Sequence, residues 1–275
     1  MWYQYQAGDA EERHRIPAAN GLDTGIPNVA RIYDYLLGGK DNFAVDRDAA
    51  ERILQARPAA ALACRQNRRF LTSVVQILAF SGIRQFLDIG CGLPAKYNVH
   101  EIAQAAAPDS RVVYVDYDHV VVSHAEVLLK GGSPQVVVVE ADLRDPQKIL
   151  DGAERLIDFG EPVAVLMFAV LHFLTDADQP RKAVRGLTEA LAPGSTVALS
   201  HVTGEGTDPA TGQAAPQVYR GASAPLVPRS RQDITRFFDG LNLMEPGVTD
   251  INLWPGKPSG PRSPLALYGG LARKP

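Results

Sequence analysis

The sequence predicts an α/β fold with a mostly parallel sheet, preceded by a helical segment. From Arg84 onward, short β-branched runs alternate with stretches of helical periodicity, which is the pattern of βαβ units. The run Val136–Val139 is apolar at consecutive positions, which indicates a strand buried on both faces, as in parallel sheets. The 275 residues, 45% of them hydrophobic, suffice for one large domain with an appendage.

Three parts are expected along the chain. Residues 1–27 are polar and aperiodic, which predicts a flexible arm. Residues 28–82 are expected to form a helical cap of three helices: the first begins at Asn28 and stops at Gly38, Asp46 caps the second, and the third covers residues 59–81. Residues 83–275 are expected to form the sheet domain.

The elements of the sheet domain follow from periodicity and from turn residues. Residues 203–228 are rich in glycine and proline, and a connection of that length is expected to be a functional lid or disordered. Ser230 is expected to begin a helix that Gly240 ends. The remaining expected strands are 85–89, 111–115, 135–139, 163–168, 196–201, 243–251 and 264–271, and the remaining expected helices are 99–106, 119–130 and 179–191.

Composition excludes several classes of protein. The net charge of −3 and the pI of ≈ 6.1 provide no general basic field for extended nucleic acid or an anionic membrane. Cys64 and Cys91 form no Cys-x-x-Cys pair, which argues against a disulfide scaffold or a zinc ribbon, and no metal site is expected. The apolar stretch 163–174 is too short to span a bilayer, and the N-terminus lacks the apolar region of a signal peptide, so a cytoplasmic location is expected.

The segment Phe86 to Pro94 carries the clearest functional pattern, a strand followed by a glycine-containing turn. Gly90 and Gly92 let a backbone turn approach a nucleotide, and their spacing also fits an NAD(P)-dependent oxidoreductase. Asp88 favours a different nucleotide, because a carboxylate at the strand end repels a pyrophosphate but accepts from the ammonium of an amino-acid-bearing nucleoside such as S-adenosylmethionine. The alternative is a carboxylate that merely caps the next helix or fixes the turn.

Two further carboxylates follow the next two predicted strands. Asp116 can accept both ribose hydroxyls of a nucleoside, although it can also cap the next helix, a task for which Asp118 is better placed. Asp142 can accept from the exocyclic amine of adenine while Leu143 packs on the ring. Three carboxylates at successive strand ends predict one crevice for an adenosine with a cationic tail.

Candidate catalytic residues are fewer. His172 follows the fourth strand and is expected to face the transferable group as a general base, with a buried core histidine as the alternative. Tyr33 and Tyr35 are the next candidates. The segment 38–43, with Gly39 and Lys40, is expected to cover the crevice, and the alternative is a helix end followed by a surface loop.

These motifs resemble the predicted S-adenosylmethionine-dependent methyltransferase family of actinobacterial type, formerly described as a domain of unknown function. The resemblance covers residues 28–275 and rests on Ala30 to Phe43, Asn67 to Phe70, Phe86 to Pro94, Asn98 to Glu101, Ala141 to Pro146, Ala169 to Phe173 and Tyr268 to Gly270. It implies a Rossmann-like class I methyltransferase fold, with a seven-stranded, mostly parallel sheet whose last strand is antiparallel. The cofactor residues expected from this resemblance, from the strand ends and from the covering segment are Asp88, Gly90, Gly92, Asp116, Tyr117, Asp142, Leu143, Ala169, Gly39 and Lys40.

The expected function is that of a methyltransferase that uses S-adenosylmethionine and acts on an unidentified small-molecule acceptor. Two alternatives stay open at this point: a non-catalytic S-adenosylmethionine-binding sensor or partner protein, and an NAD(P)-dependent oxidoreductase. Binding and catalysis use the same crevice, so the sequence does not separate a sensor from an enzyme. It specifies neither the acceptor nor the oligomeric state.

Overall fold

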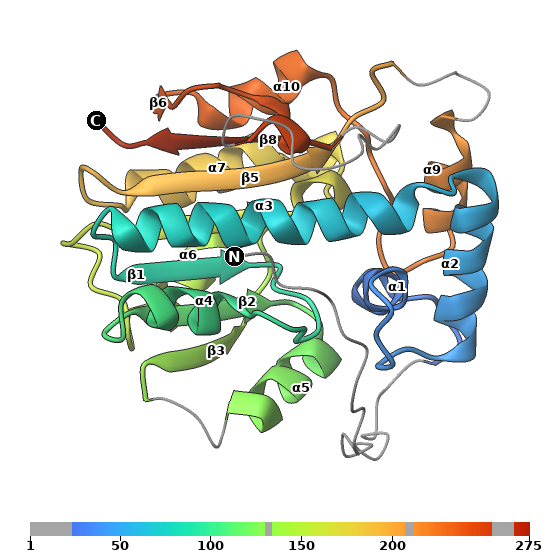
Figure 1. The fold of residues 1–275 in the computed structure, drawn as a ribbon, viewed down its shortest axis with the longest axis horizontal. Helices are drawn as coiled ribbons and strands as arrows, with labels where there is room; N and C mark the ends of the chain where they lie inside the picture. The colour runs from blue at the N-terminus through green and yellow to red at the C-terminus, as the bar shows by residue number, and fades with distance from the viewer. Residues whose placement is uncertain (1–23, 130–133, 207–211, 255–266) are drawn as a thin grey trace, which may run out of the picture.

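The computed structural model describes residues 24–129, 134–206, 212–254 and 267–275. The predicted flexible arm, residues 1–27, lies almost entirely outside them. The described chain forms three layers, with helices on both faces of a central sheet (Figure 1). The elements are α1 (Val29–Leu36), α2 (Ala44–Ala56), α3 (Ala60–Phe80), β1 (Gln85–Ile89), α4 (Val99–Ala106), β2 (Arg111–Asp116), α5 (His119–Leu129), β3 (Val136–Glu140), α6 (Pro146–Ala153), β4 (Ala164–Phe168), η1 (Leu171–Phe173), η2 (Asp176–Asp178), α7 (Pro180–Glu189), β5 (Thr196–Val202), α9 (Ala214–Tyr219), α10 (Arg231–Thr235), η3 (Arg236–Phe238), β6 (Asn242–Leu243), β7 (Thr249–Asp250), η4 (Ile251–Leu253) and β8 (Leu267–Arg273).

The central sheet has the strand order β3-β2-β1-β4-β5-β8-β6, and β7 pairs with β8. The first five of these strands are parallel, and β8 runs antiparallel to β5. The prediction of a mostly parallel sheet with an antiparallel last strand is confirmed. The single strand predicted at 243–251 is wrong, because the chain turns at Gly247. Its φ is 80° and its N–H donates to the Met244 carbonyl (2.8 Å), so two strands of two residues result.

Both faces of the sheet are buried, because successive residues of a strand point to opposite sides. Leu87 of β1 and Val113 of β2 belong to a hydrophobic cluster with α6, α7 and η3. Their neighbours Phe86 and Val112 belong to a second cluster with α3 and α4. The apolar strands of the sequence therefore form the middle layer, as predicted.

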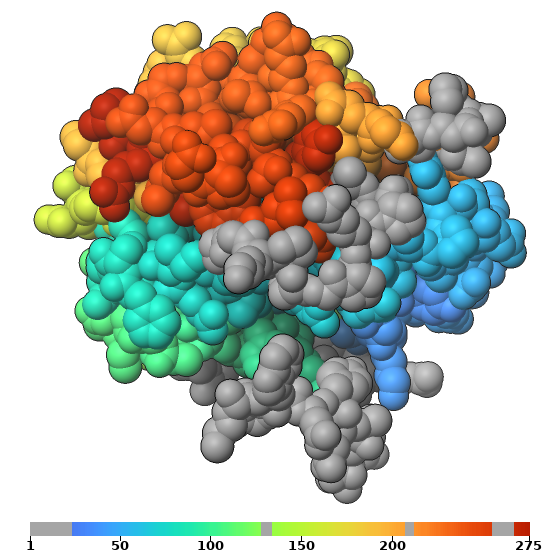
Figure 2. Space-filling view, turned by 45° about the horizontal axis from the view of Figure 1, so that its top comes forward, coloured from blue at the N-terminus to red at the C-terminus, as the bar shows by residue number. Residues whose placement is uncertain are grey.

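A third hydrophobic cluster, here called the cap cluster, is formed by α1, α2, α9 and the first residues of α3. It lies beyond the carboxyl ends of the parallel strands, at the right in Figure 1, and the blue residues of α1 and α2 form the right-hand side of the molecule in Figure 2. α1 begins as predicted, because the Asn28 side chain accepts from the backbone N–H groups of Ala30 (2.9 Å) and Arg31 (3.2 Å).

The predicted cap of α2 is wrong. Phe43 is the residue that precedes the helix, and Asp46 lies at the third helical position. There Asp46 is fully buried, and its carboxylate accepts from the backbone N–H of Phe43 (2.8 Å) and from Nε of Arg31 (2.7 Å). Asp46 thus joins α2 to α1 through a buried ion pair.

Helix α3 is shared between the cap cluster and the sheet. Its first residues, including Cys64, contribute to the cap cluster, whereas Phe70, Val74 and Leu78 pack on the sheet. The boundary at residue 82 between a helical cap and a sheet domain stays a prediction. Because α3 contributes to both clusters, it holds the cap cluster in position against the strand ends.

Residues 203–228, expected to be a lid or disordered, contain α9 in their described part. Tyr219 of α9 is buried in the cap cluster. Ser223 contacts the start of α1, because its hydroxyl accepts from the Val29 N–H (3.1 Å) and its own N–H donates to the Pro27 carbonyl (2.8 Å). This segment therefore encloses the carboxyl edge of the sheet together with α1.

Candidate functional site

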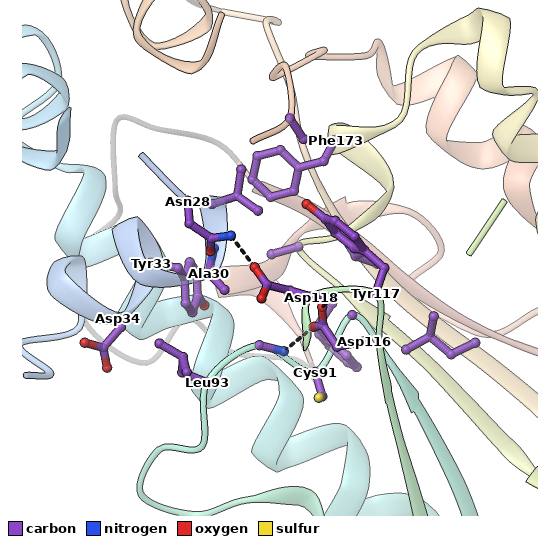
Figure 3. A pocket seen from close by; sticks show the side chains of 18 of the residues that line it. Asn28, Ala30, Tyr33, Asp34, Cys91, Leu93, Asp116, Tyr117, Asp118 and Phe173 are labelled. Carbon is purple, nitrogen blue, oxygen red and sulfur yellow. Dashed lines mark hydrogen bonds between the residues drawn. The ribbon is translucent and has the colours of Figure 1, made fainter. Parts of the chain in front are cut away.

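A cavity of ≈ 1060 Å³ lies at the carboxyl ends of β1, β2, β3 and β4, between these strand ends and helices α1 and α3. Figure 3 shows Asp116, Asp118 and Tyr117 on the strand side and Tyr33 on the α1 side. The cavity is not lined by His172 or by Tyr35, whose hydroxyl donates to Glu51 (2.5 Å). It is lined by all the other residues selected from the sequence: Tyr33, Gly39, Lys40, Asp88, Gly90, Gly92, Asp116, Tyr117, Asp142, Leu143 and Ala169.

The turn after β1 has the backbone conformation that its glycines predicted. Gly90 and Gly92 have φ angles of 68° and 65°, in the left-handed region that favours glycine. The Gly90 N–H donates to the carbonyl of Val115 (2.8 Å). A Cβ at position 90 would lie 2.4 Å from the Val170 side chain, so only glycine fits between β1 and the end of β4.

Asp88, the last polar residue of β1, is buried at the base of the cavity. Its carboxylate accepts no hydrogen bond from the described part of the chain. Burial raises the pKa of Asp88 to about 7; the positive charge of Arg68 opposes this rise and the negative charge of Asp116 adds to it. Burial deprives the charged Asp88 carboxylate of water, and a cationic ligand would compensate for that loss of hydration.

Asp116 fixes the turn after β2. Its two oxygens accept from the backbone N–H groups of Gly92 (3.0 Å) and Asp118 (3.0 Å). Burial raises the pKa of Asp116 to about 6, although these hydrogen bonds oppose the rise. Asp118, not Asp116, caps α5, because its carboxylate accepts from the Val120 N–H (2.8 Å). Asp118 also accepts from the side-chain amide of Asn28, which joins α1 to the end of β2 (Figure 3).

Asp142, after β3, is held by a neighbouring arginine. Its carboxylate accepts from Nε (2.9 Å) and Nη2 (2.6 Å) of Arg144, and also from the backbone N–H of Arg144 (2.8 Å). Burial tends to raise the pKa of Asp142, but the hydrogen bonds and charge of Arg144 outweigh it and lower that pKa. Leu143 is buried and contributes to the cavity wall. An adenine amine would have to share the Asp142 oxygens with Arg144.

The chain turns sharply at the end of β4. Ala169 has a φ of 55°, an uncommon conformation for a residue with a side chain. Its N–H donates to the carbonyl (3.2 Å) and the hydroxyl (2.9 Å) of Ser200. This turn directs Val170 and Phe173 to the cavity wall.

His172 does not reach the cavity. It is 3% exposed; its Nδ1 accepts from the Val202 N–H (3.3 Å), and its ring packs against those of Phe173 and His201. Burial lowers the pKa of His172 well below its ordinary value, and the nearby His201 and Arg229 add to this. Successive side chains of a 3-10 turn point about 120° apart, so η1 directs Phe173 to the cavity and His172 to β5. The geometry does not support the predicted general base.

A chain of hydrogen bonds connects α1 with the end of β4. The Tyr33 hydroxyl, which lines the cavity, donates to the Cys64 carbonyl (3.2 Å) and accepts from the Asn67 amide (3.0 Å). The Asn67 carbonyl oxygen accepts from the Ser200 hydroxyl (2.6 Å), which in turn holds the Ala169 N–H. Burial raises the pKa of Tyr33 well above its ordinary value. Tyr33 therefore keeps its proton and offers the cavity an oxygen that accepts.

The segment 38–43 is organised by Asp34 of α1. The Asp34 carboxylate accepts from the Asp41 N–H (2.9 Å) and from the Asn42 amide (2.8 Å). A Cβ at Gly39 would lie 1.9 Å from this carboxylate, which explains the glycine, although the positive φ (84°) belongs to Gly38. Gly39 and Lys40 lie on the cavity wall, and the covering role of their segment stays a prediction.

Several polar residues on the cavity wall are not among the expected site residues, including Asn28, Asn67, Arg68 and Asp118. Asn28 and Asp118 were considered only as helix caps. Asn67 and Arg68 belong to the motif Asn67 to Phe70, for which no role was assigned. Membership of that motif was the available signal, whereas the contacts that bring these side chains to the cavity are all between distant parts of the chain.

The described residues contain no group of three or more His, Cys, Asp or Glu side chains that could hold a metal ion. No helix among them has the length and apolar character needed to cross a membrane.

The comparison with known families matches nearly the whole chain. The model of a family described as S-adenosyl methyltransferase matches residues 15–275. No curated protein matches the chain. The family match decides against the NAD(P)-dependent oxidoreductase, which the spacing of Gly90 and Gly92 left open.

Solved structures agree with this family. A DUF574 family protein from Streptomyces avermitilis is 40% identical, with a TM-score of 0.87 over 92% of this chain and 99% of that one. A candidate methyltransferase from Thermobifida fusca is 38% identical, with a TM-score of 0.86 over 93% of this chain and 97% of that one. The plantazolicin methyltransferase BamL is 11% identical, with a TM-score of 0.51 over 90% of this chain and 96% of that one, a likeness of fold alone. The chain belongs to the S-adenosyl methyltransferase family and is a methyltransferase of the Rossmann-like class I fold that uses S-adenosylmethionine.

Proposed function

We propose that this methyltransferase acts on a small-molecule acceptor that binds beside the cofactor in the same cavity. The observation that carries the proposal is the size and division of the cavity. Its ≈ 1060 Å³ lies slightly above the range of about 300–1,000 Å³ for small-molecule sites, which leaves room for a second small molecule. Carboxylates line the strand side, whereas the helix side adds apolar side chains, among them Ala30, Leu37 and Leu71, to its polar ones.

The strand side fits S-adenosylmethionine. Each oxygen of Asp116 accepts one backbone N–H, so lone pairs remain for ribose hydroxyls. The buried carboxylate of Asp88 suits the ammonium of the amino-acid tail, and Gly90 and Gly92 let the backbone approach the ligand. Leu143 supplies apolar surface for the adenine ring. We assign a weaker role to Asp142, because Arg144 already engages both of its oxygens.

The chain's residues orient the acceptor and exclude water. The bound cofactor supplies an activated methyl group, so alignment of the acceptor is the main requirement, and such orientation contributes about 7–11 kcal/mol. Tyr33 Oη can accept a hydrogen bond from the acceptor but does not remove a proton, because its own hydrogen is donated to the Cys64 carbonyl. We assign no proton transfer to His172, because it lies outside the cavity wall.

Gly39 and Lys40 are proposed to close the helix side of the cavity. Their segment adopts its shape through hydrogen bonds to Asp34 rather than through burial, since Gly38 and Lys40 are exposed. A segment held by a few partly buried hydrogen bonds can open locally for ligand exchange. Closure would then shield the reacting groups from water.

The acceptor class is tested by following labelled methyl groups. The purified protein is incubated with methyl-labelled S-adenosylmethionine and an extract of the source cells, separated into low-molecular-weight and macromolecular fractions. Label should move into the low-molecular-weight fraction, and the Asp116→Ala variant should transfer much less at the same cofactor concentration. Label that enters only the macromolecular fraction would contradict a small-molecule acceptor.

The cellular setting remains part of the proposal. Cys64 and Cys91 are free, which supports a reducing compartment such as the cytoplasm. The net charge of −3 supports a partner other than extended nucleic acid. The helical cap of residues 28–82 and the sheet domain of residues 83–275 are proposed as two units that enclose one site for cofactor and acceptor.

A further inference from the structure

Arg68 of α3 lies at the Asp88 end of the cavity without forming an ion pair. Its Nη2 donates to the backbone carbonyl of Tyr97 (2.8 Å) and, at 3.4 Å, to that of Lys96. Arg68 is the cation whose charge acts on Asp88, yet no salt bridge joins the two among the described residues. A guanidinium and a buried carboxylate therefore face one space without neutralising each other directly.

The space between the two charges is open. Arg68 and Asp88 both line the main cavity, and both also line an adjoining cavity of ≈ 340 Å³ that extends toward Asn98 and Tyr114. Within the described residues, the Arg68 guanidinium donates hydrogen bonds only through Nη2. Its Nε and Nη1 therefore remain available to a ligand. A guanidinium binds a carboxylate through two parallel N–H groups, which a single ammonium does not match.

We propose that Arg68 and Asp88 form a receptor for a zwitterion, in which Arg68 binds the carboxylate and Asp88 the ammonium of the cofactor's amino-acid tail. This inference rests on the proposed placement of the cofactor at the strand ends. It deepens that placement by giving a role to a residue that no strand-end pattern selects.

Two features of the surroundings support the arrangement. Tyr97, whose carbonyl accepts from Arg68, has a φ of 62°, which is uncommon and strained for a residue with a side chain. In this conformation its carbonyl oxygen lies 2.8 Å from Nη2 of the guanidinium. Arg68 is thus fixed before the ligand arrives, which reduces the entropy lost on binding. The raised pKa of Asp88 is consistent with a carboxylate whose cationic partner is the ligand.

The test compares three ligands that differ only in the tail. S-adenosylhomocysteine carries both charges, its decarboxylated analogue keeps only the amine, and 5′-methylthioadenosine carries neither. Calorimetry with the wild-type protein should show the tightest binding for S-adenosylhomocysteine. Arg68→Met should weaken S-adenosylhomocysteine about 10- to 100-fold, the size expected for a charge-assisted hydrogen bond, and leave both other ligands unchanged.

Two further variants complete the comparison. Asp88→Asn should weaken S-adenosylhomocysteine and the decarboxylated analogue but not methylthioadenosine. Arg69→Met, a change at the exposed neighbouring arginine outside both cavities, is the matched control and should bind all three ligands like the wild type. Retained methylthioadenosine binding shows that each variant is folded.

Two results would overturn the proposal, and a third would overturn its premise. An equal loss for all three ligands in Arg68→Met would make Arg68 a structural residue, and no loss would place the carboxylate elsewhere. If the wild-type protein bound none of the three ligands, the placement of the cofactor itself would be wrong. The methylthioadenosine measurement separates this last case from the other two.

Discussion

The two sides of the cavity are built in different ways. On the strand side, Asp88 and Asp116 stand at the ends of buried parallel strands, and the contacts that fix Asp116 are backbone N–H groups of the adjacent turns. On the helix side, Asn28 and Tyr33 are held by side-chain hydrogen bonds to Asp118 and Asn67, distant along the chain. The contacts that shape the strand side are therefore local to the sheet, whereas the helix side depends on the strand side for its shape.

The largest expected effect is a loss of stability that begins on the helix side. Asp46→Ala removes the buried carboxylate that forms an ion pair with Arg31, and breaking a buried ion pair typically costs about 3–5 kcal/mol. Chemical denaturation should show this loss, with the exposed Asp48→Ala on the same helix as the control. If the two sides are built as described, tryptic cleavage should increase in α1 and α2 before it increases in the sheet. Simultaneous cleavage throughout would show that the two sides unfold together.

A substitution on the strand side should lower the affinity for S-adenosylhomocysteine. Asp116→Ala removes the acceptor for the ribose hydroxyls in a buried site, so S-adenosylhomocysteine should bind more weakly by about 1–3 kcal/mol. Asp109→Ala, an exposed change at the opposite end of the strands, is the control in the same calorimetric titration. Unchanged affinity in Asp116→Ala would place the ribose elsewhere.

The third prediction concerns pH and the strand side. The pKa of Asp88 is about 7 in the empty protein, above its ordinary value of 3.8, so below pH 7 the carboxyl must lose a proton before it binds an ammonium. S-adenosylhomocysteine affinity should rise between pH 5.5 and 7, by up to about tenfold per unit, and level off above it. In Asp88→Asn the part of the slope near pH 7 should disappear. An unaltered slope in that variant would assign the titration to another group, such as Asp116.

The same raised pKa has an opposite effect on stability. A carboxyl whose folded pKa lies above its unfolded value contributes stability below pH 4, and this is lost as the pH rises to 7. The empty Asp88→Asn protein should therefore have a larger free energy of unfolding at pH 8 than the wild type. Equal free energies of unfolding at pH 8 would mean that the Asp88 carboxylate is hydrated in the folded protein.

A smaller effect is expected where the two sides meet. Asn28→Ala removes the cap of α1 and the contact with Asp118, at a cost of about 1 kcal/mol. Amide hydrogen exchange at residues 29–43 should become faster, and in the wild type it should slow when S-adenosylhomocysteine is added. If neither the Asn28→Ala substitution nor the ligand changed the exchange rates at residues 29–43, this segment would not close over the cavity.

The smallest effect on binding is expected at His172. Because it lies outside the cavity, His172→Asn should leave S-adenosylhomocysteine affinity unchanged while it lowers the free energy of unfolding by about 1 kcal/mol. Calorimetry and denaturation on the same sample separate the two quantities. Once an acceptor is identified, a loss of turnover at unchanged stability would restore His172 as a catalytic residue.

The contrast between the two sides also explains what the sequence could predict. The strand side is encoded locally: an apolar run, a carboxylate and glycines with positive φ place Asp88, Gly90 and Gly92 within one short segment. The helix side depends on contacts between distant residues, such as Asn67 with Ser200, which no local pattern contains. For this reason Arg68 was missed.

Two local errors have physical causes. His172 was selected because it follows β4 closely, but the 3-10 turn η1 rotates the chain and presents Phe173 to the cavity instead. The helix α6 was not predicted, although Pro146 at its first position and the Asp145 side chain, which accepts from the Lys148 N–H (3.2 Å), are ordinary start signals. Gly152 lies inside this short helix, and a glycine weakens the helical pattern of the sequence.

The shared helix α3 restricts how new acceptor specificities can arise in this fold. Asn67 of α3 holds Tyr33 on the cavity wall, and one turn later Phe70 packs edge-on against Phe168 of β4, with ring centroids 5.3 Å apart. A substitution in this part of α3 that reshapes the acceptor space thus also disturbs the core of the sheet. Evolution and protein engineering alike are expected to diversify this enzyme through α1 and the loop after it, while α3 varies little.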